Sequence, residues 1–443
     1  MSGTDEHAQA AVGRWLARLT GSQRALVAMG TGALGTLGFA RLFAWPLFVL
    51  SAAGLLVLLD GAVRRPKPLA AAFSRGFFWG FGHFLLGLHW VGAAFLQVDD
   101  GAALLAPFGV VGLSAGMAVF VGLGAAAAVP LWTSDMRRLA VFALVMTGAE
   151  LVRGHLFGGF PWNLAGYIWP AGGQVSQIAA YVGIYGLSAL TWLLAATPAA
   201  VFDIKQGWLS RLGPMLLAAL GLGIAYGSGY QRLQAAPVAQ PGESPVIRVA
   251  DSGLTQREKN ADNPDQEFRV LDLLLAESGT PRDSDAAIVI WPEGAIPVVN
   301  FVAFQRRIEG EEERFVEPAS YGDRMMQDMG AALGDRVLIT GATSIRPHPE
   351  APQYFNSALI IDASAGNAAV FGAYDKHRLV PFGEFLPFWD LYSDVPIAPL
   401  QNIGKGFTAG PRPGRLVVPS ENADFVQLLI CYEGIFPGFV PRE

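Results

Sequence analysis

Long apolar segments fill the first half of the chain, and short apolar runs alternate with amphipathic ones in the second half. Between residues 25 and 230 each apolar segment is close to the ~20 residues that a helix needs to cross a bilayer. We therefore predict about seven membrane-spanning helices, near 25–40, 43–60, 76–97, 103–132, 139–152, 175–202 and 212–230. Their high Gly and Ala content suits close packing of helices in lipid.

The Lys and Arg residues between these segments predict the orientation of the helices. If the N-terminus is cytoplasmic, eleven basic residues fall in cytoplasmic segments, and only Arg41 and Arg153 fall in outer loops. This asymmetry matches the positive-inside rule. The eleven are Arg14, Arg18, Arg24, Arg64, Arg65, Lys67, Arg75, Arg137, Arg138, Lys205 and Arg211. An odd number of spans then places everything after residue 231 outside the cytoplasm.

A Pro-, Gln- and Ala-rich linker at 231–244 separates the two patterns. Beyond it, we predict strands at 245–251, 285–291, 336–341, 355–362 and 424–430, with helices at 263–278 and 317–334. Strands that alternate with helices favour a layered α/β fold. The predicted organisation is a cytoplasmic N-terminus (1–24), a transmembrane helical domain (25–230), the linker, and an extracytoplasmic α/β domain (245–443).

Composition supports a membrane protein and excludes several classes of function. Hydrophobic residues make up 52% of the chain and charged residues 15%, against about 25% charged in soluble domains. A net charge of -6 with no basic run disfavours nucleic-acid binding. One cysteine cannot form an internal disulfide, and the six histidines show no metal-ligand spacing, so metal catalysis is not supported.

Two nucleotide- or hydrolase-like motifs lie inside predicted membrane helices. "GTGALG" (30–35) satisfies G-x-G-x-x-G, and "GLSAG" (112–116) satisfies G-x-S-x-G. Neither follows a strand, so helix packing is the better interpretation. The loop "ELVRGHLFGGFPWNLAGY" (150–167) collects Gly, Pro and aromatic residues on the outer side. It is either an aromatic belt at the membrane interface or a rim where the soluble domain meets lipid.

Three stretches of the second half place reactive groups at or just after strand ends, where the catalytic groups of α/β sheets commonly emerge. They are "WPEG" with Glu293, "YDKHRLVPFGEF" with Lys376 and Glu384, and "LLICYEG" with Cys431, Tyr432 and Glu433. Each residue alone has a simpler interpretation. The cysteine could be a small buried hydrophobe, the glutamate a structural carboxylate, and the lysine a solvated loop cation.

Together, a Cys, a Lys and a Glu supply what nucleophilic acyl transfer requires. A free thiol has a pKa near ~8.5 and needs a base or a cation to react as the thiolate. Glu293 can accept the thiol proton, and Lys376 can favour the thiolate and stabilise the oxyanion. From the residues alone, we predict a membrane-anchored α/β domain with this set as its candidate active site.

The three stretches, in this order, resemble the Glu–Lys–Cys signature of the nitrilase (carbon–nitrogen hydrolase) superfamily. With the preceding spans and the segments "FGHFLLGLHWV" and "RGHLFGGFPWNLAGY", the chain resembles its membrane-embedded branch, the bacterial apolipoprotein N-acyltransferases, from about residue 25 to its end. The resemblance implies an αββα sandwich after the helical bundle. It also implies an inner-membrane enzyme of lipoprotein maturation, which uses a phospholipid, usually phosphatidylethanolamine, as acyl donor.

The resemblance implies a thioester on Cys431, with Glu293 as base, Lys376 as oxyanion partner and Glu384 as supporting carboxylate. Tyr432 and Glu433 match supporting positions. The acceptor would be the amino group of a diacylglyceryl-modified apolipoprotein cysteine, with no cofactor required. Nothing in the sequence predicts an oligomer, so we expect a monomer.

Two departures from the family pattern stand out. The usual lysine–tryptophan pair after the first strand of the soluble domain is Lys259–Asn260 here, and the chain ends twelve residues after Cys431. We expect the αββα domain to be incomplete at its C-terminal end. Two alternative functions remain open, a membrane-tethered amidase or nitrilase that passes the acyl group to water, and a catalytically silent truncated copy.

Overall fold

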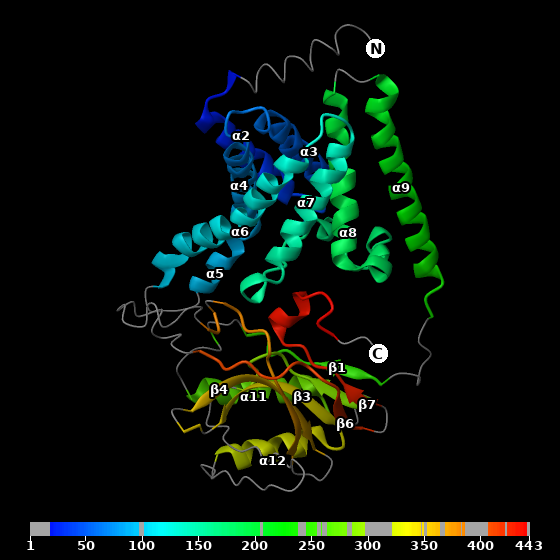
Figure 1. The fold of residues 1–443 in the computed structure, drawn as a ribbon. Coiled ribbons are helices and arrows are strands. Elements are labelled where there is room, and N and C mark those ends of the chain that lie inside the picture. Colours follow the sequence, from blue (N-terminus) through cyan, green and yellow to red (C-terminus); the bar gives the residue numbers. More distant parts are fainter. Residues whose placement is uncertain are drawn as a thin grey trace. The chain divides into compact units, whose positions relative to one another are not determined.

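The computed structural model divides into two compact units, Met1–Pro237 and Val238–Glu443 (Figure 1). It describes residues 18–96, 102–203, 207–237, 245–254, 258, 264–280, 286–296, 321–346, 348–349, 352–363, 368–381, 383–385, 406–420 and 423–440. Each unit has its own hydrophobic core, so each is described by itself.

The first unit is entirely helical in its described residues. Its main helices are α2 (Gly21–Thr36), α3 (Trp45–Ala62), α4 (Pro68–Gly87), α6 (Ala106–Ala128), α7 (Arg137–Arg153), α8 (Ala179–Ala196) and α9 (Trp208–Gln234). Short helices connect them: α5 (Gly92–Phe95), η1 (His89–Val91), η2 (Ala102–Leu105), η3 (Val129–Leu131), η4 (Leu156–Gly158), η5 (Ala165–Ile168), η6 (Val175–Ile178) and η7 (Thr197–Phe202). Every predicted span overlaps one of the main helices.

Four helical segments in the described part of the chain are long and apolar enough to cross a membrane: Trp45–Ala62, Ala103–Leu131, Val175–Phe202 and Trp208–Gln234. The prediction of a helical membrane domain is therefore confirmed. The predicted number of seven spans is not reached by this criterion, because α2 and α7 have only 16 and 17 residues and the 20-residue α4 carries polar groups such as Arg75.

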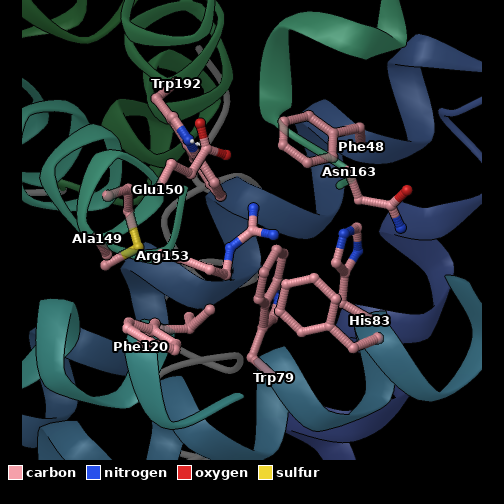
Figure 2. A pocket seen from close by; sticks show the side chains of 12 residues that line it. Phe48, Trp79, His83, Phe120, Ala149, Glu150, Arg153, Asn163 and Trp192 are labelled. Carbon is pink, nitrogen blue, oxygen red and sulfur yellow. Dashed lines mark hydrogen bonds between the residues drawn. The ribbon is translucent and has the colours of Figure 1, made fainter. Parts of the chain in front are cut away.

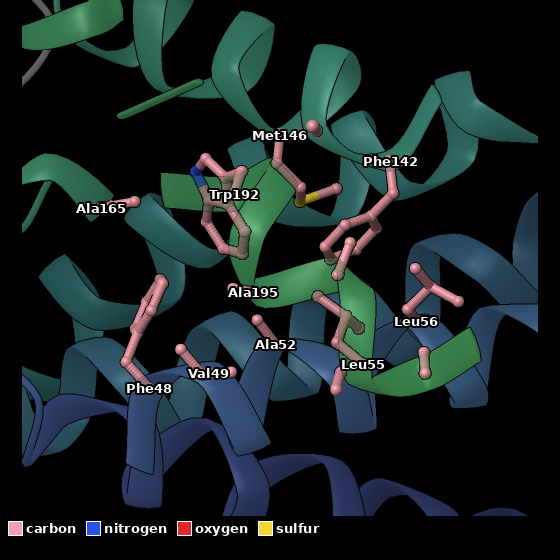
Figure 3. Packing of buried hydrophobic residues seen from close by; sticks show 14 of the residues in the cluster. Phe48, Val49, Ala52, Leu55, Leu56, Phe142, Met146, Ala165, Trp192 and Ala195 are labelled. Carbon is pink, nitrogen blue, oxygen red and sulfur yellow. The ribbon is translucent and has the colours of Figure 1, made fainter. Parts of the chain in front are cut away.

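Helix α3 lies at the centre of the helical core. It contributes Phe48, Ala52 and Leu55, which pack against Phe142 of α7 and Trp192 of α8 (Figure 3). The ring centroids of Phe48 and Trp192 are 5.2 Å apart, and those of Phe142 and Trp192 are 5.6 Å apart in an edge-to-face arrangement. Large rings from three helices thus fill the space that the many alanines leave open.

Two of the three glycines of "GTGALG", Gly32 and Gly35, serve helix packing. They lie within α2, where a Cβ on Gly32 would lie 1.9 Å from the carbonyl oxygen of Trp79 in α4. A Cβ on Gly35 would lie 2.6 Å from Oγ of Ser51 in α3. Small residues thus let three backbones approach closely. "GLSAG" lies in the middle of α6, where a helix replaces the strand–turn–helix of a nucleophile elbow.

The second unit contains a mixed five-stranded sheet in the order β1-β2-β3-β4-β5. Strands β1 (Ile247–Val249), β2 (Ile288–Ile290) and β3 (Val337–Arg346) are parallel, whereas β4 (Gln353–Asp362) and β5 (Ala369–Asp375) continue the sheet antiparallel. A two-stranded antiparallel sheet, β6 (Leu416–Ser420) with β7 (Ala423–Val426), is separate.

Successive side chains along each strand point to opposite faces of the large sheet. Val289 and Leu338 point toward helices α11 (Pro264–Ser278) and α12 (Tyr321–Leu333). Ile288 and Ile339 point the other way, toward Val418 and its neighbours in β6 and β7. The described residues thus supply three of the four layers of the predicted αββα sandwich, one of helices and two of sheet.

Strands β5 and β6 were missing from the prediction. Strand β5, "AVFGAYD", contains a central glycine and is half-exposed, so it shows no strong apolar alternation. Strand β6 contains Pro419, which is typical of an edge strand. The predicted strand at 424–430 was too long, because β7 ends at Val426.

We expect Gly32→Ala to destabilise the helical unit, because the new methyl group would force α2 away from the α4 backbone. The cost should be about 1–3 kcal/mol, which is typical of overpacking. Thermal unfolding in detergent measures it. Gly30→Ala is the matched control, since a Cβ at Gly30 meets nothing within 4 Å. Equal melting temperatures for the two variants would contradict the proposed contact.

Candidate active site

A buried lysine joins two carboxylates at one edge of the large sheet. Lys376 directly follows β5, and its side chain is 1% exposed. Its Nζ lies 3.2 Å from Oε1 of Glu293, in the turn after β2, and 2.9 Å from Oε1 of Glu384. The structure therefore brings together three of the predicted site residues from segments up to 91 residues apart in the sequence.

Asn356 of β4 is a member of this site that sequence analysis missed. Its Nδ2 donates to Oε1 of Glu293 and to Oε1 of Glu384, both at 2.7 Å. The backbone carbonyl oxygen of Asn356 accepts a hydrogen bond from the backbone amide of Lys376 at 2.8 Å. The pairing of β4 with β5 therefore sets the two side chains beside each other. The only signal in the sequence was an amide within the apolar run "YFNSALIID".

The two carboxylates have different surroundings. Glu384 accepts from Lys376 and Asn356 through Oε1 and from the Val380 amide through Oε2 at 2.8 Å, and its side chain is 12% exposed. Both of its oxygens are thus engaged. Glu293 is 36% exposed, and its charge acts on the Cys431 thiol. Of the two, Glu293 is the one positioned to exchange a proton with the thiol.

Cys431 has a strained backbone and an accessible thiol. Its φ of 45° lies in the left-handed region. The residue follows the extended Ile430 and is the first residue of the 3-10 helix η9 (Cys431–Ile435). Such a conformation costs a non-glycine residue about 1–3 kcal/mol and is often found at active sites. The residue is exposed, so this sharp turn presents the sulfur instead of burying it as a small hydrophobe.

The resting thiol is protonated and the lysine is charged. Partial burial and the charge of Glu293 raise the pKa of Cys431, and they outweigh the opposing effect of Lys376. Burial alone would lower the pKa of Lys376, but the hydrogen bond that its ammonium donates to Glu384 and the charges of both carboxylates raise it overall. The charge of Lys376 lowers the pKa of the thiol, but the charges of Glu293 and Glu384 offset this effect, so the lysine alone does not deprotonate Cys431. The thiol instead requires a base.

Glu433 fastens η9 to the segment that carries Lys376. The fully buried carboxylate accepts through Oε1 from the Tyr374 hydroxyl at 2.7 Å and from the amides of His377 and Arg378 at 2.8 and 3.0 Å. Through Oε2 it accepts from the Ile430 amide at 2.9 Å. Burial and the neighbouring carboxylate raise the pKa of Tyr374, which keeps its hydroxyl as a donor. Glu433 thus links residues flanking Lys376 to the residue before Cys431.

Tyr432 contributes its ring to the packing next to Cys431. It is 7% exposed, and its ring meets Phe436 edge-to-face at 5.0 Å. All six predicted site residues therefore lie in the described part of the second unit. Lys259 and Asn260, where the family pattern departs, lie outside the described residues.

In the helical unit, two buried charges hold the loop that follows α7. Nη1 of Arg153 donates to the carbonyl oxygens of Phe160 and Trp162 at 2.7 and 2.6 Å. Oε1 of Glu150 accepts from the Ala165 amide at 2.9 Å. The loop singled out for its aromatic residues is thus fixed from inside by its own flanking helix.

Figure 2 shows the Arg153 guanidinium in the middle of a small pocket, between Glu150 and Trp192 on one side and His83 and Asn163 on the other. About 20 Å³ is open to the centre of a water-sized sphere, which is room for a single water. The pocket is too small for an organic substrate.

Within the described residues, no group of three His, Cys, Asp or Glu side chains could hold a metal ion.

Comparison with known proteins gives two family matches that together cover most of the chain. Residues 31–197 match the model of the apolipoprotein N-acyltransferase N-terminal domain, and residues 248–440 match the carbon–nitrogen hydrolase model. The chain is 35% identical to the apolipoprotein N-acyltransferase of Caulobacter vibrioides over 92% of its own length and 73% of the relative.

Two further relatives carry the same name. The protein of Rhodopseudomonas palustris is 33% identical over 94% of this chain and 75% of its own length. That of Rhizobium rhizogenes is 33% identical over 96% of this chain and 76% of its own length. The chain thus spans about three quarters of the length of these relatives.

The pH dependence of Cys431 alkylation tests the electrostatics of the site. Because the pKa of the thiol is raised, the rate should keep rising with pH beyond ~8.5, the value of a free thiol. Glu293→Gln removes a negative charge and should shift the profile to lower pH. Mass spectrometry after maleimide treatment is unambiguous, since the chain has one cysteine.

Glu277→Gln is the matched control for this shift. It removes the same charge from an exposed position of α11 and should leave the alkylation profile unchanged. A plateau at neutral pH in the unsubstituted protein would contradict the account, because it would reveal a resting thiolate paired with Lys376.

Proposed function

Because the chain belongs to the apolipoprotein N-acyltransferase family, we propose that it transfers a fatty acyl chain from a phospholipid to the N-terminal amino group of a diacylglyceryl-modified apolipoprotein cysteine. The observation that supports this most strongly is the grouping of the exposed Cys431 thiol with Glu293, whose charge acts on the thiol and whose carboxylate contacts the buried Lys376. A thiol, a base and a fixed cation are the groups that acyl transfer from an ester needs.

In the first half-reaction, Sγ of Cys431 attacks the carbonyl carbon of the sn-1 ester while Glu293 accepts the thiol proton. The carbonyl π electrons move to the oxygen, and the Lys376 ammonium stabilises the resulting oxyanion. When the C–O ester bond breaks, Glu293 returns the proton to the departing alkoxide. The products are a lysophospholipid and a thioester on Cys431.

In the second half-reaction, the free amino group of the acceptor attacks the thioester carbonyl. Glu293 accepts a proton from the nitrogen as the amide bond forms, and Lys376 again faces the oxyanion. The C–S bond breaks, and the proton from Glu293 returns to the thiolate. The overall reaction exchanges an ester for an amide, so it needs no external oxidant, reductant or cofactor.

The other residues of the site act by positioning. Glu384 and Asn356 fix Lys376 and orient Glu293, because each contacts the shared cluster with distances of 2.7–2.9 Å. Glu433 holds the turn of Cys431 beside the lysine segment, and Tyr432 supports that turn by packing. We propose that the enzyme acts as a monomer.

The membrane setting suits substrates that are themselves anchored in lipid. We place the protein in the bacterial inner membrane with its N-terminus in the cytoplasm and its catalytic domain on the outer side, on the basis of the Lys and Arg asymmetry. Phosphatidylethanolamine is the proposed donor. A bilayer-bound enzyme avoids drawing an acyl chain into water, which costs about 0.8 kcal/mol for each exposed CH₂.

A transfer assay with the full chain in detergent tests this function. With phosphatidylethanolamine and a synthetic diacylglyceryl lipopeptide, the mass of the peptide should increase by one acyl chain. Glu293→Gln should slow the reaction by about 10²–10⁴-fold, as expected for loss of a general base. Glu277→Gln, outside the site, should have no effect.

Two other outcomes of the assay would contradict the proposal. Release of free fatty acid, or of ammonia from small amides, without triacylated peptide would indicate a hydrolase. Unchanged lipid and peptide with a folded protein would indicate a catalytically silent chain.

Gly341→Ala should impair catalysis by displacing the base. A Cβ on Gly341 of β3 would lie 2.6–2.8 Å from backbone atoms of Pro292, Glu293 and Gly294. A shift of about 1 Å in a catalytic group can cost about 10²-fold in rate. Gly372→Ala in β5 is the control, because its Cβ meets only Cδ1 of Ile360, at 3.8 Å. Equal transfer rates would show that the turn tolerates the methyl group.

A further inference from the structure

A pocket lined by four basic residues lies at the end of the helical unit where α2 and α4 begin. Its cations are Arg24 of α2, Arg65 and Lys67 of the connection between α3 and α4, and Arg75 of α4. The pocket has a volume of about 440 Å³, and its remaining lining residues are small or apolar except for Ser74. We call it the basic pocket.

The backbone adds positive potential to these four charges. Helices α2 and α4 have 16 and 20 residues, and both begin at the basic pocket, so their N-terminal amide dipoles are directed toward it. Neither helix has an acidic residue in its first turn, where one would normally offset the dipole. Among the described residues, no Asp or Glu lines the pocket.

Arg75 is a fixed and buried part of the basic pocket. It is 8% exposed, and its Nη1 donates to the carbonyl oxygen of Leu58 in α3. Gly61 leaves room for it, since a Cβ there would lie 3.4 Å from the same nitrogen. The charges of Arg24 and Arg65 act directly on Arg75. Like charges gathered around a partly enclosed space repel one another, and an anion in that space would relieve the repulsion.

Exposed leucines on other faces of α2 and α4, the two helices that line the basic pocket, indicate what kind of anion it would hold. Leu26 is 66% exposed on α2, two residues after Arg24, and Leu69 is 57% exposed on α4, two residues after Lys67. A free anion gains nothing from such leucines, whereas a phospholipid would set its phosphate among the cations and its acyl chains along the helices. Basic pockets between membrane helices on the cytoplasmic side are suited to anionic headgroups.

We propose that the basic pocket binds the phosphate of an anionic phospholipid, which is held in the cytoplasmic leaflet if the proposed orientation is correct. This site is separate from the chemistry of Cys431 and takes a lipid of different charge from the zwitterionic donor. Its occupant would link α2 to the start of α4 and thereby stabilise the helical unit.

Lipid-dependent thermal stability of the full chain in detergent tests the proposal. Phosphatidylglycerol should raise the melting temperature by mass action, and phosphatidylcholine should not. In the double variant Arg65→Gln/Lys67→Gln, the apparent affinity for phosphatidylglycerol should fall about 25-fold, at about fivefold for each removed charge. Both residues are exposed, so the variant should melt normally in phosphatidylcholine.

Arg64→Gln/Arg137→Gln is the matched control, because it removes two charges on the same side without touching the basic pocket. It should retain the response to phosphatidylglycerol. Equal loss of response in both variants would overturn the proposal in favour of nonspecific charge. Full stabilisation by inorganic phosphate, with displacement of the lipid, would assign the site to a free anion instead. Neither result depends on acyl transfer.

Discussion

The active site depends on burying one positive charge. Lys376 is 1% exposed, and a buried ammonium is tolerated only when charged and hydrogen-bonding partners surround it. Glu293 and Glu384 supply the charge at 3.2 and 2.9 Å, and Asn356 contacts both of them. The requirement to satisfy this one lysine therefore holds together the turn after β2, the centre of β4 and the loop after β5.

The same cluster sets the chemistry of the cysteine. Two carboxylates around one ammonium leave Cys431 in a field that keeps its proton in the resting state. A protonated thiol is a poor nucleophile, and in the proposed reaction Glu293 accepts its proton when the sulfur attacks the ester carbonyl. Lys376 then serves as a fixed charge, because the interactions that retain its proton are the ones that hold it in the site.

Both units use buried charges to fix backbone segments that follow helices and strands. Glu433 accepts hydrogen bonds from three amides and a hydroxyl near Cys431. Arg153 donates hydrogen bonds to two carbonyls in the loop after α7. At the opposite end of α7, Arg138 lies 3.3 Å from each of Asp60 and Asp203. Such groups cannot be left without partners once they are buried, so each one specifies a single loop conformation.

The sequence was sufficient for features that rest on local pattern. Apolar length predicted the helical unit, and reactive groups at strand ends predicted Glu293, Lys376 and Cys431, which do lie near one another. Asn356 escaped prediction because its role arises from the register of β4 against β5, which no local pattern encodes. The partners of Glu433 are mostly backbone amides, which every residue possesses. The raised pKa of Cys431 could not be predicted from the sequence, because it depends on Glu293 and Glu384 both contacting the same lysine.

The most direct test of the account is the intact mass of the full chain after brief incubation with phosphatidylethanolamine and no acceptor. The account predicts an increase by one acyl chain, carried as a hydroxylamine-sensitive adduct on Cys431 and absent in Cys431→Ala. An adduct of the same size in Cys431→Ala, or lysophospholipid formation without any adduct on Cys431, would contradict the central claim that this thiol carries the acyl group.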